Sequence, residues 1–423
     1  MRRRGGGGLR SFIATVGYLS ALQELGLLQE ARYTSAVSGG AWATVMYSFY
    51  AKGEEGVAAS DEELLGRTPP PEEITMQALD ELAETSALRA ATSGLLKEIL
   101  REVIIAITSL PLFDLGRVWR DAISAVFLRP YGIRTGVPFT WDTESAKKIA
   151  KRNAGAIKAK DFVLVNGGVP FPIVGFGLLG PSDMVPFQEP RSYTMMEATP
   201  LYIGTPLVQN VTFHSKRWCS HRKGKGRCKA ESSKTETLLM GGFLSPFAFG
   251  GHKPPKSGVP PGEGGDVIEV PIPEHTFSLR EVAGSSSYAP GGYFASSVLL
   301  PLLRQWIGIH FPYWSPAQRS PTTTPVVMAD GGDIESPHII GPLLRGVTNL
   351  VVFLNFCTPL APPSAWDPHA RPPTVRDIDD DFPPFFGIVL DDWGEDNAYD
   401  FSRNQVRHTH SHARTHARTH ARA

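Results

Sequence analysis

One serine of the sequence stands in a setting that favours nucleophilic chemistry. Ser38 comes after a short apolar stretch and before Gly39 and Gly40, and an apolar helix pattern follows them. A strand, a tight turn of small residues and a helix form a nucleophile elbow, which exposes a serine hydroxyl at the end of a sheet. A serine that only caps the following helix fits the same pattern. The motif alone leaves both alternatives open.

Asp330 is the candidate base, because a serine hydroxyl needs a base before it can attack a carbonyl carbon. Asp330 follows the apolar stretch 326–329 and precedes two glycines, so we expect its carboxylate at the same sheet edge as Ser38. An aspartate that only forms a turn is the alternative, since Asp-Gly pairs are common in turns. None of the internal histidines stands in a catalytic motif, and the nearest to Asp330, His338, adjoins Pro337. The sequence therefore favours a carboxylate that acts directly on the serine.

A run of four glycines, 5–8, stands directly before the first helix pattern. Glycine lets the backbone approach a ligand closely, and the N–H groups at a helix start attract anions. An oxyanion that develops during ester cleavage is such an anion, and Gly39 would supply a further amide beside the serine. A flexible glycine-rich terminus is the alternative interpretation.

Taken together, these motifs resemble those of the cytosolic phospholipase A2 family, within the patatin-like lipid acyl hydrolases. The resemblance covers most of residues 5–357, and the motifs occur in the family's order. The matching segments are Gly6–Ser11, Gly17–Leu19, Tyr33–Trp42, Met196–Pro200, Ala283–Ser286, Asp330–Gly332 and Pro342–Leu344.

The resemblance implies a serine–aspartate dyad that works without a histidine. It assigns Ser38 as the nucleophile and Asp330 as the base. Gly7 and Gly8 match the glycines of the family's oxyanion hole, with Gly39 as a further donor. The implied enzyme is a carboxylic ester hydrolase that forms an acyl-enzyme. We assign it no cofactor and no metal-binding residue, and the sequence does not indicate whether its activity depends on calcium.

The resemblance also implies a substrate class. Arg10 matches an arginine that holds the substrate phosphate, a task that suits the paired donors of a guanidinium group. The implied substrates are fatty-acyl esters of glycerophospholipids or lysophospholipids at a membrane surface. The alternative is a catalytically impaired lipid-binding protein on the same fold. The intact dyad opposes that alternative, whereas the lack of the family's strand before the glycine loop favours it.

Composition narrows the class of protein. The chain has 423 residues, 42% of them hydrophobic, with 42 basic and 42 acidic side chains. That balance argues against a nucleic-acid-binding protein. The three cysteines are too few for a disulfide scaffold, and no apolar run is long enough for a transmembrane helix. We expect a cytoplasmic protein, peripheral to membranes, and the sequence does not indicate an oligomeric state.

Hydrophobic periodicity predicts an α/β fold. The order helix, strand, turn and helix around Ser38, with apolar stretches at 326–329 and 350–356, predicts a three-layer α/β/α domain whose central sheet is mainly parallel, as in patatin. We expect this catalytic domain to cover residues 1–405, with cap insertions near 53–160 and 210–290. Residues 406–423, a repeat rich in Thr, His, Ala and Arg, are expected to form a low-complexity disordered tail.

Overall fold

The computed structural model describes a large part of the chain. The described residues are 8–66, 70–75, 77–78, 81, 86–87, 115–153, 155–188, 192–215, 218–219, 231–251, 270–289, 308–318, 322–355, 358–367, 369–371, 373–374 and 376–379. The tail at 406–423 lies outside them. Within these residues, no helix has both the length and the apolar character that a membrane span requires.

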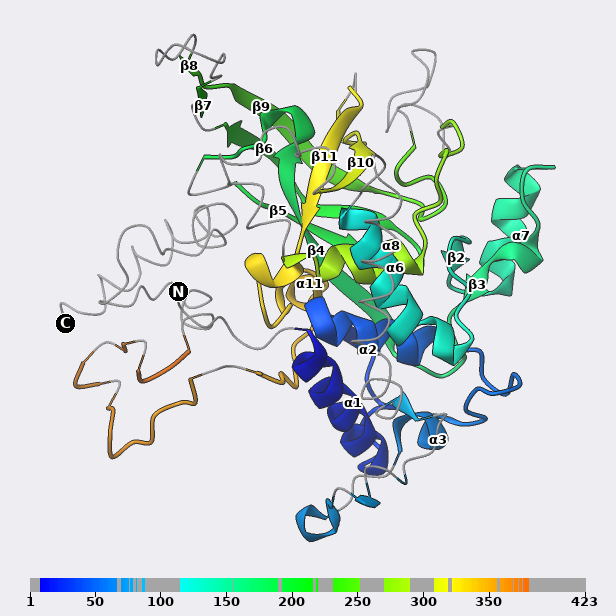
Figure 1. Ribbon diagram of the computed structural model, residues 1–423, viewed down its shortest axis with the longest axis vertical. Helices are drawn as coiled ribbons and strands as arrows, with labels where there is room; N and C mark the ends of the chain where they lie inside the picture. The colour runs from blue at the N-terminus through cyan, green and yellow to red at the C-terminus, as the bar shows by residue number, and fades with distance from the viewer. Residues whose placement is uncertain are drawn as a thin grey trace, which may run out of the picture.

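The helices and strands follow one another as shown in Figure 1. They are α1 (Leu9–Glu24), β1 (Tyr33–Ala36), α2 (Ser38–Phe49), α3 (Asp61–Leu65), α6 (Leu115–Phe127), β2 (Phe139–Thr140), α7 (Thr143–Arg152), β3 (Val163–Leu164), β4 (Phe171–Pro181), β5 (Thr194–Ala198), β6 (Ile203–His214), β7 (Trp218–Cys219), β8 (Glu231–Ser232), β9 (Thr235–Leu244), α8 (Leu279–Ser286), β10 (Ile309–Tyr313), β11 (Thr324–Ala329) and α11 (Ile340–Leu344). The helix–strand–turn–helix order predicted around Ser38 is therefore present in α1, β1 and α2.

The central sheet is curled and mainly antiparallel, so the prediction of a mainly parallel sheet is wrong (Figure 1). Its seven strands follow the order β10-β11-β4-β5-β6-β9, and β1 also pairs with β4. Among the described strands of this sheet, only β1 and β4 pair in parallel. A separate small sheet pairs β2 with β3 in parallel.

The wrong prediction has a physical cause. Strand β4 is buried from Pro172 to Pro181, and a strand covered on both faces has the continuous apolar run that parallel sheets also show. Burial does not determine direction, whereas the connections do. The amide of Thr199 donates to the carbonyl of Tyr202 (2.9 Å) in the turn between β5 and β6. A turn this short can join only antiparallel neighbours.

A strand expected over 350–356 is also not formed in its described part, residues 350–355. The apolar side chains of this segment are more than a third exposed, from Leu354 at 38% to Val351 at 70%. The segment contacts α1, where Phe353 stacks on Tyr18 with ring centroids 4.2 Å apart. The Tyr18 hydroxyl donates to Asn355 Oδ1 (2.7 Å). The segment therefore lies beside α1 without joining the sheet.

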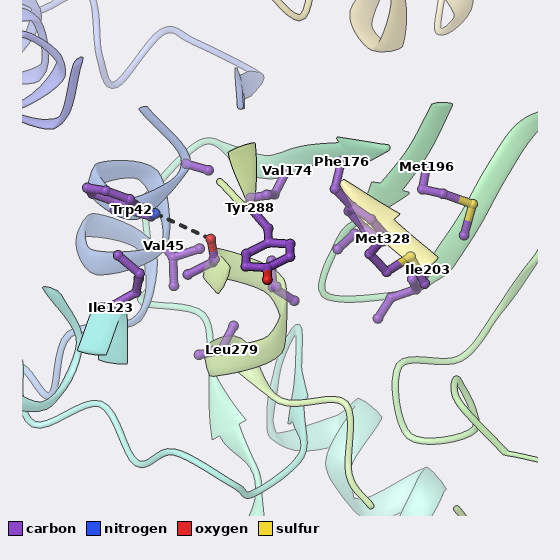
Figure 2. Close-up of a cluster of buried hydrophobic side chains, with 14 of the residues drawn as sticks. Trp42, Val45, Ile123, Val174, Phe176, Met196, Ile203, Leu279, Tyr288 and Met328 are labelled. Carbon is purple, nitrogen blue, oxygen red and sulfur yellow. Dashed lines mark hydrogen bonds between the residues drawn. The ribbon is translucent and has the colours of Figure 1, made fainter. Parts of the chain in front are cut away.

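The core fixes the helices around β4. Figure 2 shows buried side chains of α2, α6 and α8 meeting those of β4 and its neighbouring strands. Trp42 of α2 stacks on Phe127 of α6 (4.4 Å between ring centroids), and its Nε1 donates to the Ala283 carbonyl of α8 (3.3 Å). Helices α2 and α8 are thus packed in fixed positions on β4, and Ser38 and Asp330 lie beside one edge of this strand.

Candidate active site

Two strands share one edge of β4 and point toward each other. Strand β1 runs parallel to β4 and ends with Ala36 opposite Val174. Strand β11 runs antiparallel and ends with Ala329 opposite Gly177. Strand β5 pairs with β4 at both of these positions, so β1 and β11 must both lie on the opposite edge. The carboxyl ends of β1 and β11 therefore converge beside Gly175.

This convergence brings together Ser38 and Asp330, which are far apart in the sequence. The Ser38 hydroxyl donates to Asp330 Oδ2 at 3.1 Å. The other carboxylate oxygen, Oδ1, accepts the amide N–H of Gly332 at 2.8 Å, which fixes the orientation of the carboxylate. Both residues are buried, with 9% of Ser38 and 7% of Asp330 exposed. In this arrangement a carboxylate can take the proton of the serine hydroxyl.

The turn at Ser38 has the geometry of an elbow and excludes the alternative of a helix cap. Ser38 has φ 53°, an uncommon conformation for a residue with a side chain. The N-cap of α2 is Val37, and Ser38 is already the first helical residue. The hydroxyl of Ser38 points to Asp330 and makes no capping bond.

Two predicted oxyanion-hole glycines lie against each other beside Ser38, and the third, Gly7, lies outside the described residues. A Cβ built on Gly39 would stand 1.9 Å from the carbonyl oxygen of Gly8, so only glycine fits there. Gly8 itself has φ 74° and caps α1. Helices α1 and α2 therefore begin side by side, with first-turn N–H groups that lack intrahelical acceptors.

A cavity of about 930 Å³ extends away from this pair. Ser38, Asp330 and Gly8 are among the residues that line it. The cavity continues between α1, the chain from Leu27 to Val37 and the segment 347–355. Among the described residues, no group of three or more His, Cys, Asp or Glu side chains is placed to hold a metal ion.

Arg10 is exposed in the first turn of α1 and is not among the residues that line the cavity. The structure thus brings Ser38, Asp330, Gly8 and Gly39 together but leaves Arg10 outside the group. Gly8 and Ser11, on either side of Arg10 in the sequence, both line the cavity, so a phosphate held by Arg10 would lie beside the cavity rather than within it.

His338 does not complete a triad. Its Nδ1 lies 2.8 Å from the hydroxyl of Ser35, which donates to the carbonyl of His338 itself at 2.9 Å. Its Nε2 has no hydrogen-bond partner in the described part of the chain and packs against Gly175. Complete burial, with a smaller effect of Arg345, lowers the pKa of His338 to about 3. A neutral ring bonded to Ser35 cannot serve Ser38 as its base.

Sequence reasoning missed the roles of Gly175 and Ser286. The Ser38 amide donates to Ser286 Oγ (2.9 Å), and Ser286 Oγ donates to the Gly175 carbonyl (2.6 Å). Glycine inside an apolar strand pattern often marks a close approach of another backbone. Residues 174–177 contain two such glycines, Gly175 and Gly177. Ser286 belongs to a motif that supported the resemblance, but no function was predicted for it.

Comparisons with known proteins give little support beyond this geometry. No family model matches the chain, and no curated protein sequence matches it. Among solved structures, human GIVD cytosolic phospholipase A2 is similar with a TM-score of 0.35 and 14% sequence identity. The alignment covers 80% of this chain and 43% of that one, so the chain spans less than half of that protein. A TM-score this low does not establish a shared fold, and any function must be argued from the site itself.

Proposed function

We propose that this chain is a serine hydrolase that cleaves carboxylic esters, with Ser38 as the nucleophile and Asp330 as its base. One observation carries the proposal: the Ser38 hydroxyl donates to Asp330 Oδ2 at 3.1 Å from a turn with φ 53°. A buried serine that only stabilised the fold would not need a left-handed backbone, since such conformations cost about 1–3 kcal/mol.

The acylation step follows from this geometry. Asp330 takes the proton of Ser38 as the serine oxygen attacks the carbonyl carbon of the ester. The negative charge on the carbonyl oxygen is stabilised by amide N–H groups of Gly8 and Gly39, at the starts of α1 and α2. The tetrahedral intermediate then collapses, and the leaving alcohol takes the proton back from Asp330.

Deacylation reverses these roles. A water molecule gives a proton to Asp330 and attacks the acyl carbon, and the same amides stabilise the second oxyanion. Ser38 leaves with the proton from Asp330, and a fatty acid is released. The Gly332 amide, which binds Asp330 Oδ1, keeps the other oxygen directed at the reaction in both steps.

We further propose fatty-acyl esters of glycerophospholipids or lysophospholipids as substrates. The motif resemblance supports this class, as does a cavity of about 930 Å³, which is at the upper end of ligand-pocket sizes. Its wall includes Leu19 and Leu22 of α1 and the apolar segment 350–354. Exposed apolar side chains at Leu343 and Leu344 lie near the same region and suit adsorption to a lipid surface.

The proposal is tested by following fatty-acid release from lysophosphatidylcholine. Ser38→Ala removes only the hydroxyl and should abolish release, while the protein keeps its fold by circular dichroism. Ser48→Ala is the matched control, because Ser48 lies on the same helix, is fully buried, and has a hydroxyl without a partner in the described structure. Release by Ser38→Ala protein at the parent rate would show that Ser38 is not the nucleophile.

A further inference from the structure

We propose that Ser286 is a positioning residue whose hydroxyl holds the backbone of Ser38 in its reactive conformation. This inference rests on the proposed function and extends it to a residue outside the dyad. Ser286 is the last residue of α8 and is fully buried. Its Oγ accepts the amide N–H of Ser38 at 2.9 Å and donates to the carbonyl of Gly175 at 2.6 Å.

The Ser38 amide needs such an acceptor from outside its own helix. Ser38 is the first residue of α2, and the N–H groups in the first turn of a helix have no intrahelical partner. Buried N–H groups without an acceptor are rare, because they lose their hydrogen bond to water. Ser38 also has φ 53°, a conformation that persists only where the surrounding structure enforces it.

The direction of the two hydrogen bonds makes Ser286 specific for this task. Its only hydroxyl proton goes to the Gly175 carbonyl, which can only accept, so an oxygen lone pair faces the Ser38 N–H. Gly175 lies on β4 between Val174 and Gly177, where β1 and β11 end. The Ser286 hydroxyl therefore connects the turn at Ser38 to Gly175 of β4, the position at which β1 and β11 converge.

The hydrogen bond to Ser286 also determines which amide N–H groups at the elbow are available to bind an oxyanion. Because the Ser38 N–H is bound to Ser286, it is not available to an oxyanion. That function remains with the N–H groups of Gly39 and Gly8. Ser286 thus acts on the position of the nucleophile and does not contact the charge that develops on the substrate.

Helix α8 is anchored firmly enough to hold this position. Arg280 pairs with Asp121 of α6 at 2.8 Å, and the Ala283 carbonyl accepts Trp42 Nε1 of α2. At its start, Ser278 and Glu281 form a capping box. The place of Ser286 is therefore fixed from both neighbouring helices.

The test compares Ser286→Ala with Ser285→Ala. Ser285 lies on the same helix, is equally buried and has a hydroxyl without a partner in the described structure, so its loss removes no hydrogen bond. Ser286→Ala should lower kcat for a soluble nitrophenyl ester by roughly ten- to a hundredfold, because a nucleophile displaced by about 1 Å loses that much. KM should stay unchanged, and Ser285→Ala should keep the parent kcat.

The rate at which a fluorophosphonate labels Ser38 should fall by the same factor in Ser286→Ala, which a general loss of stability would not produce in folded protein. If Ser286→Ala does not fold, Ser286→Cys, whose thiol bonds more weakly, is measured in its place with the same expectation. An unchanged kcat, a rise in KM alone, or an equal loss in Ser285→Ala would overturn the inference. A parent protein that neither hydrolyses the ester nor reacts with the probe would instead refute the proposed function.

Discussion

Gly39→Ala tests whether the contact between the two glycines builds the oxyanion hole. A Cβ at Gly39 would lie 1.9 Å from the Gly8 carbonyl oxygen, 2.7 Å from its carbon and 3.0 Å from its Cα, whereas ordinary contact begins at 3.4 Å. The backbone of Gly8 would have to retreat by roughly 1.5 Å, and such overpacking costs about 1–3 kcal/mol. The helix propensity of alanine returns little of this cost, because Gly39 lies in the first turn of α2 and not in the helix interior. We expect a net loss of about 1–3 kcal/mol in the free energy of unfolding.

A separate effect on catalysis is expected in the protein that remains folded. Displacing the Gly8 and Gly39 amides by more than 1 Å should lower kcat/KM by about a hundredfold. Gly40→Ala is the matched control, since its Cβ would make only ordinary contacts, with Thr15 Oγ1 at 3.4 Å, Ala36 Cβ at 3.6 Å and Ser11 Oγ at 3.8 Å. Nitrophenyl-ester kinetics and urea denaturation of both variants measure the two quantities. Equal activity of Gly39→Ala and Gly40→Ala would refute the assignment of these amides.

Three further predictions concern other side chains. Asp330→Asn should lower kcat/KM by roughly 10²- to 10⁴-fold, whereas His338→Asn should leave it within a few-fold of the parent value. Asparagine is chosen because it tolerates the φ of 47° at this position. A large loss with His338→Asn alone would indicate that a histidine is the base. Burial raises the pKa of Glu335 from 4.5 to about 8, so the unfolded chain releases this proton first and stability falls as pH rises between these values. Glu335→Gln should remove that fall, which is roughly 1.4 kcal/mol per pH unit. Urea denaturation of the parent and of Glu335→Gln at pH 5, 6.5 and 8 measures the free energy of unfolding, and a difference between the two proteins that stays constant over these pH values would show that Glu335 does not titrate in this way. Arg10→Ala should reduce kcat/KM for phospholipids by roughly ten- to a hundredfold more than for nitrophenyl butyrate, and equal losses for both would remove the phosphate-binding role.

Local sequence patterns were sufficient to predict the elements that position Ser38 and Asp330. Apolar residues at three- and four-residue steps predicted α1, and the small residues after Val37 predicted the turn at Ser38. The two glycines after Asp330 predicted a turn at the end of a strand. These features depend on residues that are neighbours in the sequence, so one sequence contains the information.

The arrangement of these elements could not be predicted in the same way. We expected Ser38 and Asp330 to meet at one edge of a parallel sheet, but they meet because β1 and β11 approach from opposite directions along β4. Strand direction depends on turns such as that at Thr199, which an apolar run does not reveal. The hydrogen bond between Ser38 and Ser286 joins residues 248 positions apart, and no local pattern indicates such a contact.

The central claim is that Asp330 directly activates Ser38, and labelling with a fluorophosphonate tests it most directly. The labelled protein is digested and the modified peptide is identified by mass spectrometry, for the parent and for Asp330→Asn. We predict that the parent is labelled on Ser38 and that Asp330→Asn is labelled at least a hundredfold more slowly, as expected for the loss of a general base. A parent protein that stays unlabelled, a label on another residue, or equal labelling rates in both proteins would contradict the account.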